Sequence, residues 1–156
     1  MRTLLLILAL NLAALVANAQ PLRLPDPLPT PTPEQAYTNL LTISRFVFGG
    51  SFGPDGGPSQ GERAYRAIAA STNAVQLFSA AFSNGNTQAK CYALCGFRQF
   101  KPSIFESYAG SLRATNPFVD ITFSDLRRLA LASNIVARIS SGYYDVYLRD
   151  IQPKRP

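Results

Sequence analysis

The sequence contains no histidine and no tryptophan, and it has two cysteines among its 156 residues. The missing histidine excludes nucleophile pairs that use histidine as the base, histidine metal ligands and haem attachment through C-x-x-C-H. Acidic residues are also few, nine in total, and they form no dense cluster. Histidine-dependent catalysis is therefore excluded, and we expect a non-catalytic protein without a metal or cofactor.

The two cysteines, Cys91 and Cys95, lie in the segment KCYALCGFRQF. A zinc site needs four ligands, and the C-x-x-x-C spacing differs from the C-x-x-C of redox motifs. Residues four apart on a helix hold their Cβ atoms about 6 Å apart, beyond the roughly 3.5–4.5 Å of a disulfide. The pair is therefore predicted to pack in a hydrophobic core, with a strained disulfide as the alternative.

Residues 1–19 have the pattern of a secretory signal peptide. Arg2 gives a positive start, an apolar run follows from Leu4 to Val16, and Ala17-Asn18-Ala19 forms an A-x-A cleavage site. The apolar run is shorter than the about 20 residues that a transmembrane helix needs. We therefore expect cleavage before Gln20, a secreted or periplasmic protein, and membrane association only through an uncleaved signal segment.

Residues 20–33 form a proline-rich segment, which carries six prolines. Proline fixes its own φ and biases the preceding residue toward extended conformations, so this segment is predicted to be a semi-rigid linker. Residues 34–151 are predicted to form one helical domain, and residues 152–156 a C-terminal tail. Removal of residues 1–19 from the 156-residue chain would leave 137, which suits a single domain.

Helical spacing of apolar residues predicts an all-α bundle of about five short helices. A capping box of Thr32 and Gln35 begins the first helix, which should end at Gly49-Gly50. The other helices are expected over residues 60–84 (divided near 71–73), 87–99, 102–113 and 125–141, the last one capped by Ser124. Residues 118–123 alternate and predict a short extended piece, and residues 143–151 fit either a helix or a strand.

Residues 48–58, FGGSFGPDGGP, form a glycine-rich loop. Its five glycines and two prolines leave little side-chain volume, so the loop is expected to add little to the core. Loops held by rigid elements often carry recognition. We predict that Phe52 and the loop backbone contact a partner, with Arg63 and Arg66 of the following helix supplying charge.

Positive charge is spread along the chain, with 15 lysines and arginines against nine acidic residues and a net charge of +6. Nucleic-acid binders concentrate such charge on one face, so no specific nucleic-acid partner is expected. A weak binder of anionic ligands that uses scattered arginines is an alternative function. Its candidate residues are Arg63, Arg66 and Arg98.

Residues 86–113, NTQAKCYALCGFRQFKPSIFESYAGSLR, are predicted to form two helices, AKCYALCGF and PSIFESYAGSL. This run resembles one helical hairpin of the HEAT-type repeats, and the preceding GERAYRAIAASTNAVQLFSAAFSNG is similar to a second pair. The resemblance implies an all-α scaffold of stacked antiparallel hairpins, of a kind that binds partners. The whole chain also looks like small exported bacterial proteins of unknown function, which implies no mechanism and transfers no catalytic residue.

A carboxylate-dependent hydrolase acting on glycans is the enzyme alternative. Such enzymes place two acidic side chains on either side of the scissile bond, and the candidates here are Glu62, Glu106, Asp120 and Asp125. Glu62 also completes an S-x-x-E capping box with Ser59, in which each side chain binds the other residue's backbone N–H. The capping role is favoured, and the favoured function is an exported interaction or structural component of the cell envelope or extracellular space. Its partner would be an unknown protein or envelope component.

Export predicts a defined mature N-terminus. Mass spectrometry of the protein recovered from its native compartment should find a chain that begins at Gln20 or at its cyclised form. Recovery of the intact segment Met1–Gln20 on the envelope-associated protein would contradict cleavage and favour an uncleaved anchor.

Overall fold

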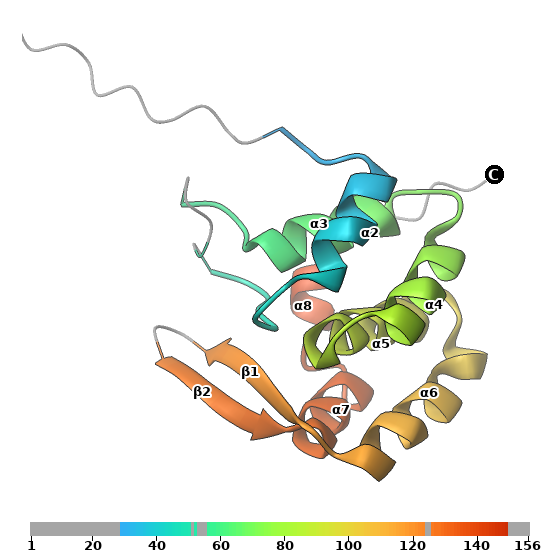
Figure 1. Cartoon of the computed structure of the whole chain (residues 1–156), viewed down its shortest axis with the longest axis vertical. Coiled ribbons are helices and arrows are strands. Elements are labelled where there is room, and N and C mark those ends of the chain that lie inside the picture. The colour runs from blue at the N-terminus through green and yellow to red at the C-terminus, as the bar shows by residue number, and fades with distance from the viewer. Residues whose placement is uncertain (1–28, 51, 53–55, 124–125, 150–156) are drawn as a thin grey trace, which may run out of the picture.

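The computed structural model describes residues 29–50, 52, 56–123 and 126–149, which form a mostly helical body with one two-stranded sheet (Figure 1). The elements of this described part are α2 (Pro33–Leu41), α3 (Gln60–Ala69), α4 (Ala74–Asn84), α5 (Thr87–Phe100), α6 (Pro102–Thr115), β1 (Phe118–Phe123), β2 (Leu126–Leu131), α7 (Ala132–Ser140) and α8 (Asp145–Leu148). The expected signal peptide, most of the linker and the C-terminal tail lie outside the described residues. Within those residues, none of the helices has the length and apolar character needed to span a bilayer.

Helix α5 is the centre of the core. It contacts α2, α3, α4, α6, α7 and β1, and the whole stretch from Cys91 to Phe97 is buried. A helix that is covered on all sides needs small residues where neighbours come close. Gly96 meets this need, because a Cβ at this position would lie 2.3 Å from the ring of Phe78. The expected helical bundle is therefore confirmed in its coarse form.

Local signals in the sequence place most helix ends correctly. Thr32 and Gln35 form the complete capping box at the start of α2, and Asn86 caps α5 through the N–H of Ala89. The predicted division near residues 71–73 separates α3 from α4, and Pro102 is the first residue of α6. These ends depend on side chains within a few residues of the break, so a single sequence suffices to predict them.

The predicted end of the first helix is wrong. Helix α2 ends at Leu41, and the chain continues without regular structure to Phe48. Phe46 forms an isolated parallel bridge with Ile121, and its N–H donates to the carbonyl of Asp120 over 2.8 Å. Phe46 and Phe48 both enter the core, which contradicts the expectation that the glycine-rich loop from Phe48 onward adds little to it.

The expected helix from Ser124 to Ser141 is wrong in its first half. Residues 126–131 form strand β2, which pairs antiparallel with β1 in the register Phe118↔Leu131 to Phe123↔Leu126. The predicted extended piece at 118–123 is confirmed as β1, and its Val119 and Ile121 are buried. Once β1 lies against the helices, residues 126–131 complete a hairpin with it, and helix α7 begins at Ala132.

The undecided segment from Tyr143 onward contains the short helix α8. The helices also pack as neighbouring pairs, α4 on α5 and α5 on α6. Such pairing occurs in many helical proteins, so it does not test the HEAT-type interpretation, which stays a prediction.

Cys91 and Cys95 are free and buried, which confirms the predicted core packing. Burial raises the pKa of both thiols well above its ordinary value. Both side chains are therefore neutral thiols at physiological pH, and they act as small apolar core residues.

The close approach at Gly96 predicts opposite effects for two glycine-to-alanine substitutions in neighbouring helices. Gly96→Ala should lower the free energy of unfolding by about 1–3 kcal/mol, because the added methyl group overpacks the ring of Phe78. Gly110→Ala is the matched control on the exposed part of α6, where a Cβ meets nothing within 4 Å. It should raise the free energy of unfolding by about 0.5–1 kcal/mol through helix propensity alone. Urea denaturation measures both, and equal effects would contradict the packing of α5 on α4.

Candidate binding surface

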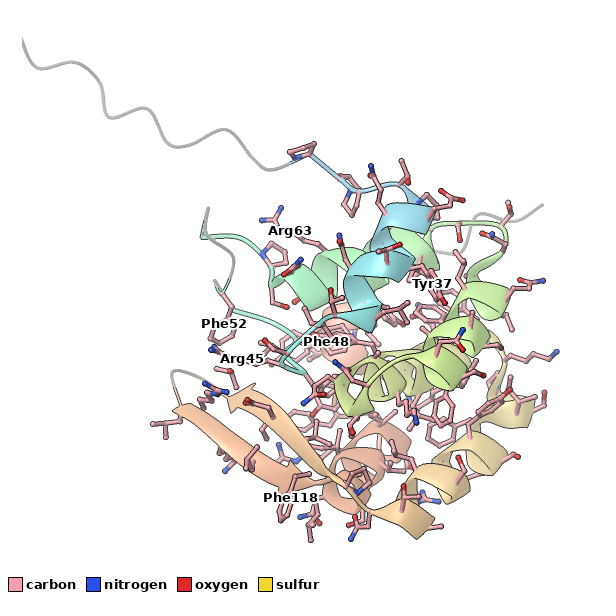
Figure 2. All side chains as sticks on the ribbon, viewed as in Figure 1. Tyr37, Arg45, Phe48, Phe52, Arg63 and Phe118 are labelled. Carbon is pink, nitrogen blue, oxygen red and sulfur yellow. The ribbon has the colours of Figure 1, made fainter. Side chains whose placement is uncertain are left out.

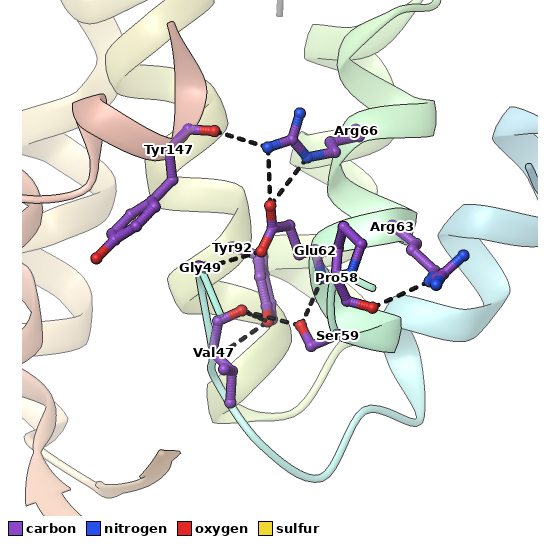
Figure 3. A network of polar contacts seen from close by, with 9 residues as sticks. All are labelled: Val47, Gly49, Pro58, Ser59, Glu62, Arg63, Arg66, Tyr92 and Tyr147. Carbon is purple, nitrogen blue, oxygen red and sulfur yellow. Dashed lines mark hydrogen bonds and ion pairs between the residues drawn. The ribbon is translucent and has the colours of Figure 1, made fainter. Parts of the chain in front are cut away.

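A buried polar network holds the irregular segment that follows α2 (Figure 3). The hydroxyl of Tyr92 accepts the N–H of Val47 over 2.9 Å and donates to the carbonyl of the same residue over 2.7 Å. The Ser59 hydroxyl donates to that carbonyl over 3.0 Å and accepts the N–H of Glu62. Gly61 makes room for this arrangement, because a Cβ there would lie 2.3 Å from the Tyr92 oxygen.

The carboxylate of Glu62 binds other groups than the capping box predicts. Its buried carboxylate accepts the N–H of Gly49 over 2.8 Å and the guanidinium of Arg66 over 2.8 and 2.9 Å. The N–H of Ser59 is thus not its partner, although Ser59 does cap α3 as predicted. Arg66 also donates to the carbonyl of Tyr147, so this ion pair connects the loop, α3 and the segment of α8.

Beside this network lies an open hollow of about 190 Å³. It is lined by Ile43, Ser44, Arg45, Val47, Phe52, Ser59, Gln60, Gly61 and Thr122. Phe52 and Arg45 lie next to each other at this edge of the molecule, above the hairpin in the view of Figure 2. The hollow therefore combines an aromatic ring, a guanidinium and the first turn of α3.

Of the predicted contact residues, Phe52 alone lines the hollow. The Nε of Arg63 donates to the carbonyl of Pro58 over 3.0 Å, and Arg66 is bound by Glu62. The sequence alone does not predict Arg45 as a contact residue, because its position depends on the pairing of the neighbouring Phe46 with β1. No local signal in the sequence marks that pairing.

The candidate acids of the enzyme alternative lie in separate ion pairs. Glu62 binds Arg66, and the other two described acids, Glu106 and Asp120, bind Arg113 and Arg127. Asp125 lies outside the described residues. None of the three described acids lines the hollow. Among the described residues, no group of three or more cysteines and acids is arranged to hold a metal ion.

The hairpin exposes large apolar side chains. Directly paired residues share a face of a sheet, so Phe118, Leu129 and Leu131 lie on the face opposite to the buried Val119 and Ile121. Phe118 is 63% exposed and Leu129 is 66% exposed. Leu126, at the start of β2, is exposed as well. Leu126 pairs with Phe123 and so lies on the other face, that of Val119 and Ile121. We call Phe118, Leu129 and Leu131 the hairpin patch.

Comparisons with protein-family models, curated proteins and solved structures found no match for this chain. The geometry of its own residues is therefore the basis for any functional conclusion.

The buried network predicts the effect of removing one hydroxyl group. Tyr92→Phe leaves the buried N–H of Val47 without its acceptor, so the free energy of unfolding should fall by about 1–3 kcal/mol. Tyr37→Phe removes a hydroxyl that accepts from Asn84 at the surface, and it should change stability by less than about 0.5 kcal/mol. Chemical denaturation compares the two, and similar costs would contradict the central role of Tyr92.

Proposed function

We propose that this chain is an exported, non-catalytic protein that binds another protein through its β-hairpin. The observation that carries this proposal is the exposed hairpin patch. Soluble proteins rarely leave several large apolar side chains exposed together unless the surface meets a partner. Export is supported by the composition of residues 1–19.

The two edges of the hairpin differ in their availability. The outer edge of β1 is engaged by Phe46, which donates its N–H to Asp120. Strand β2 pairs with β1 on one side, and no described strand pairs with its other side. An open strand edge offers a row of backbone donors and acceptors to an added strand.

Charge decides which occupant fits this edge. Arg127 and Arg128 lie in the middle of β2, between Leu126 and Leu129. Asp120 binds Arg127, yet a second copy of β2 would still bring two further arginines against one carboxylate in the same short ladder, where like charges destabilise pairing. The occupant is therefore an extended segment of a different protein, with carboxylates between apolar residues.

This proposal predicts that a single leucine controls partner capture. Leu129→Ser should reduce recovery of the bound protein from the native envelope or extracellular fraction at least tenfold, as expected when a central apolar contact is lost. Val146→Ser is the matched control, because Val146 is an exposed apolar residue of α8 outside the hairpin. Its capture should equal that of the wild type, and both variants should keep the wild-type melting temperature.

Three further results complete this test. Cross-linking should connect β2 to an acidic segment of the captured protein, and capture should weaken as the salt concentration rises. Sedimentation that shows a dimer dissociated by Leu129→Ser would replace the partner with a second copy. Equal capture by both serine variants would contradict the hairpin as the binding surface.

A further inference from the structure

We propose that the hollow beside Phe52 is a binding site for an anionic sugar, with the anion at Arg45 and the sugar ring against Phe52. This site is separate from the hairpin patch and does not depend on the partner proposed above. Its evidence is the lining of the hollow, which combines one cation, backbone donors, an aromatic wall and a hydroxyl that no described residue hydrogen-bonds.

Arg45 supplies the charge. It is exposed at the hollow and makes no ion pair or hydrogen bond within the part of the chain that the structure describes. Other arginines differ in this respect, since Arg66, Arg98, Arg113 and Arg127 each bind a carboxylate. A guanidinium binds carboxylate or phosphate oxygens through two parallel hydrogen bonds, so an anion is the natural partner for Arg45.

Thr122 supplies an observation that is independent of charge. Its hydroxyl oxygen is buried and has no hydrogen-bond partner among the described residues, and Thr122 lines the same hollow. Buried polar groups in native proteins are nearly always hydrogen-bonded. A ligand oxygen in the hollow, or a water that the ligand holds there, would satisfy this hydroxyl.

The first turn of α3 adds donors on another wall. The Ser59 hydroxyl accepts the N–H of Glu62, and the Ser59 carbonyl accepts the N–H of Arg63. The N–H groups of Gln60 and Gly61 have no partner within the described residues, and both residues line the hollow. The positive end of the helix dipole lies at the same place and favours an anion.

Size and the aromatic wall restrict the ligand class. The hollow is open and measures about 190 Å³. This space exceeds that of one inorganic oxyanion and accommodates an attached ring. Phe52 forms part of the wall, and an aromatic face packs well against the apolar side of a sugar ring. A sugar acid, free or at the end of an acidic polysaccharide, matches both features.

The test titrates glucuronate into the isotope-labelled protein secreted from its full-length gene, with amide shifts recorded by NMR. The amides of Gln60 and Gly61 should shift and saturate. Glucose lacks the anion and inorganic phosphate lacks the ring, so both should bind at least tenfold more weakly. A short uronate oligomer distinguishes a polysaccharide end from a free sugar acid as the ligand. If the oligomer binds more tightly than glucuronate, the site takes a polysaccharide end. If the two bind equally, it takes a free sugar acid.

Three variants separate binding from folding. Arg45→Gln should weaken glucuronate binding at least tenfold, because it removes the charge-assisted contact. Lys101→Gln removes the same charge from an exposed residue outside the hollow, and it should change binding less than twofold. Thr122→Val should weaken binding without lowering the melting temperature, since the hydroxyl it removes makes no hydrogen bond to any described residue.

Several outcomes would overturn this site. If the Arg45 and Lys101 variants lost glucuronate affinity equally, the binding would be general electrostatic attraction and not a specific site. Phosphate binding as tight as glucuronate would remove the role of the ring, and unchanged amides at α3 would place any binding elsewhere. The Leu129→Ser variant should bind glucuronate with wild-type affinity. Loss of partner capture and loss of glucuronate binding therefore test the hairpin proposal and the sugar site separately.

Discussion

The pairing of Tyr92 with the backbone of Val47 is the constraint on which the rest of the structure depends. Apart from the single bridge of Phe46 with β1, the chain enters the core here without helix or sheet hydrogen bonds, and its buried polar groups need partners from elsewhere. One hydroxyl satisfies both the N–H and the carbonyl of Val47. Burial raises the pKa of Tyr92, so this hydroxyl keeps its proton and remains a donor at physiological pH. Gly61 and Ser59 complete the site because they leave the required space and add a second donor.

The charged contacts extend this constraint to the surface. Glu62 is buried, and a buried carboxylate is stable only with close partners. It has two, Arg66 and the N–H of Gly49, and Arg66 reaches on to the carbonyl of Tyr147. One end of the glycine-rich loop is thereby fixed to α3 and to the α8 segment. The two arginines of the helix that follows the loop, Arg63 and Arg66, are engaged within the fold, so they are less suited to a ligand than Arg45.

The predictions made from the sequence are right where an element depends on residues close by in the chain, and wrong where it depends on distant ones. Helix starts at Thr32, Asn86 and Pro102 depend on neighbours within one turn, and a single sequence predicts them. Strand β2 and the segment that contains Phe46 depend on contacts with β1, which lies far away in the sequence for Phe46. No local pattern records such a contact. The hollow has the same origin, because its lining combines Phe52 of the glycine-rich loop with residues that only the fold brings beside it.

The placement of Arg45 follows from core packing. Phe46 is buried against the rings of Tyr92 and Tyr144, at centroid distances of 4.8 and 5.2 Å. Arg45, the residue before it, is exposed and lines the hollow at the start of α3. The same residue, Phe46, also occupies the outer edge of β1, so the edge that no described strand pairs with is that of β2. The cation of the proposed sugar site and the covered edge of β1 are therefore both tied to one residue, Phe46, through its buried ring and its backbone N–H.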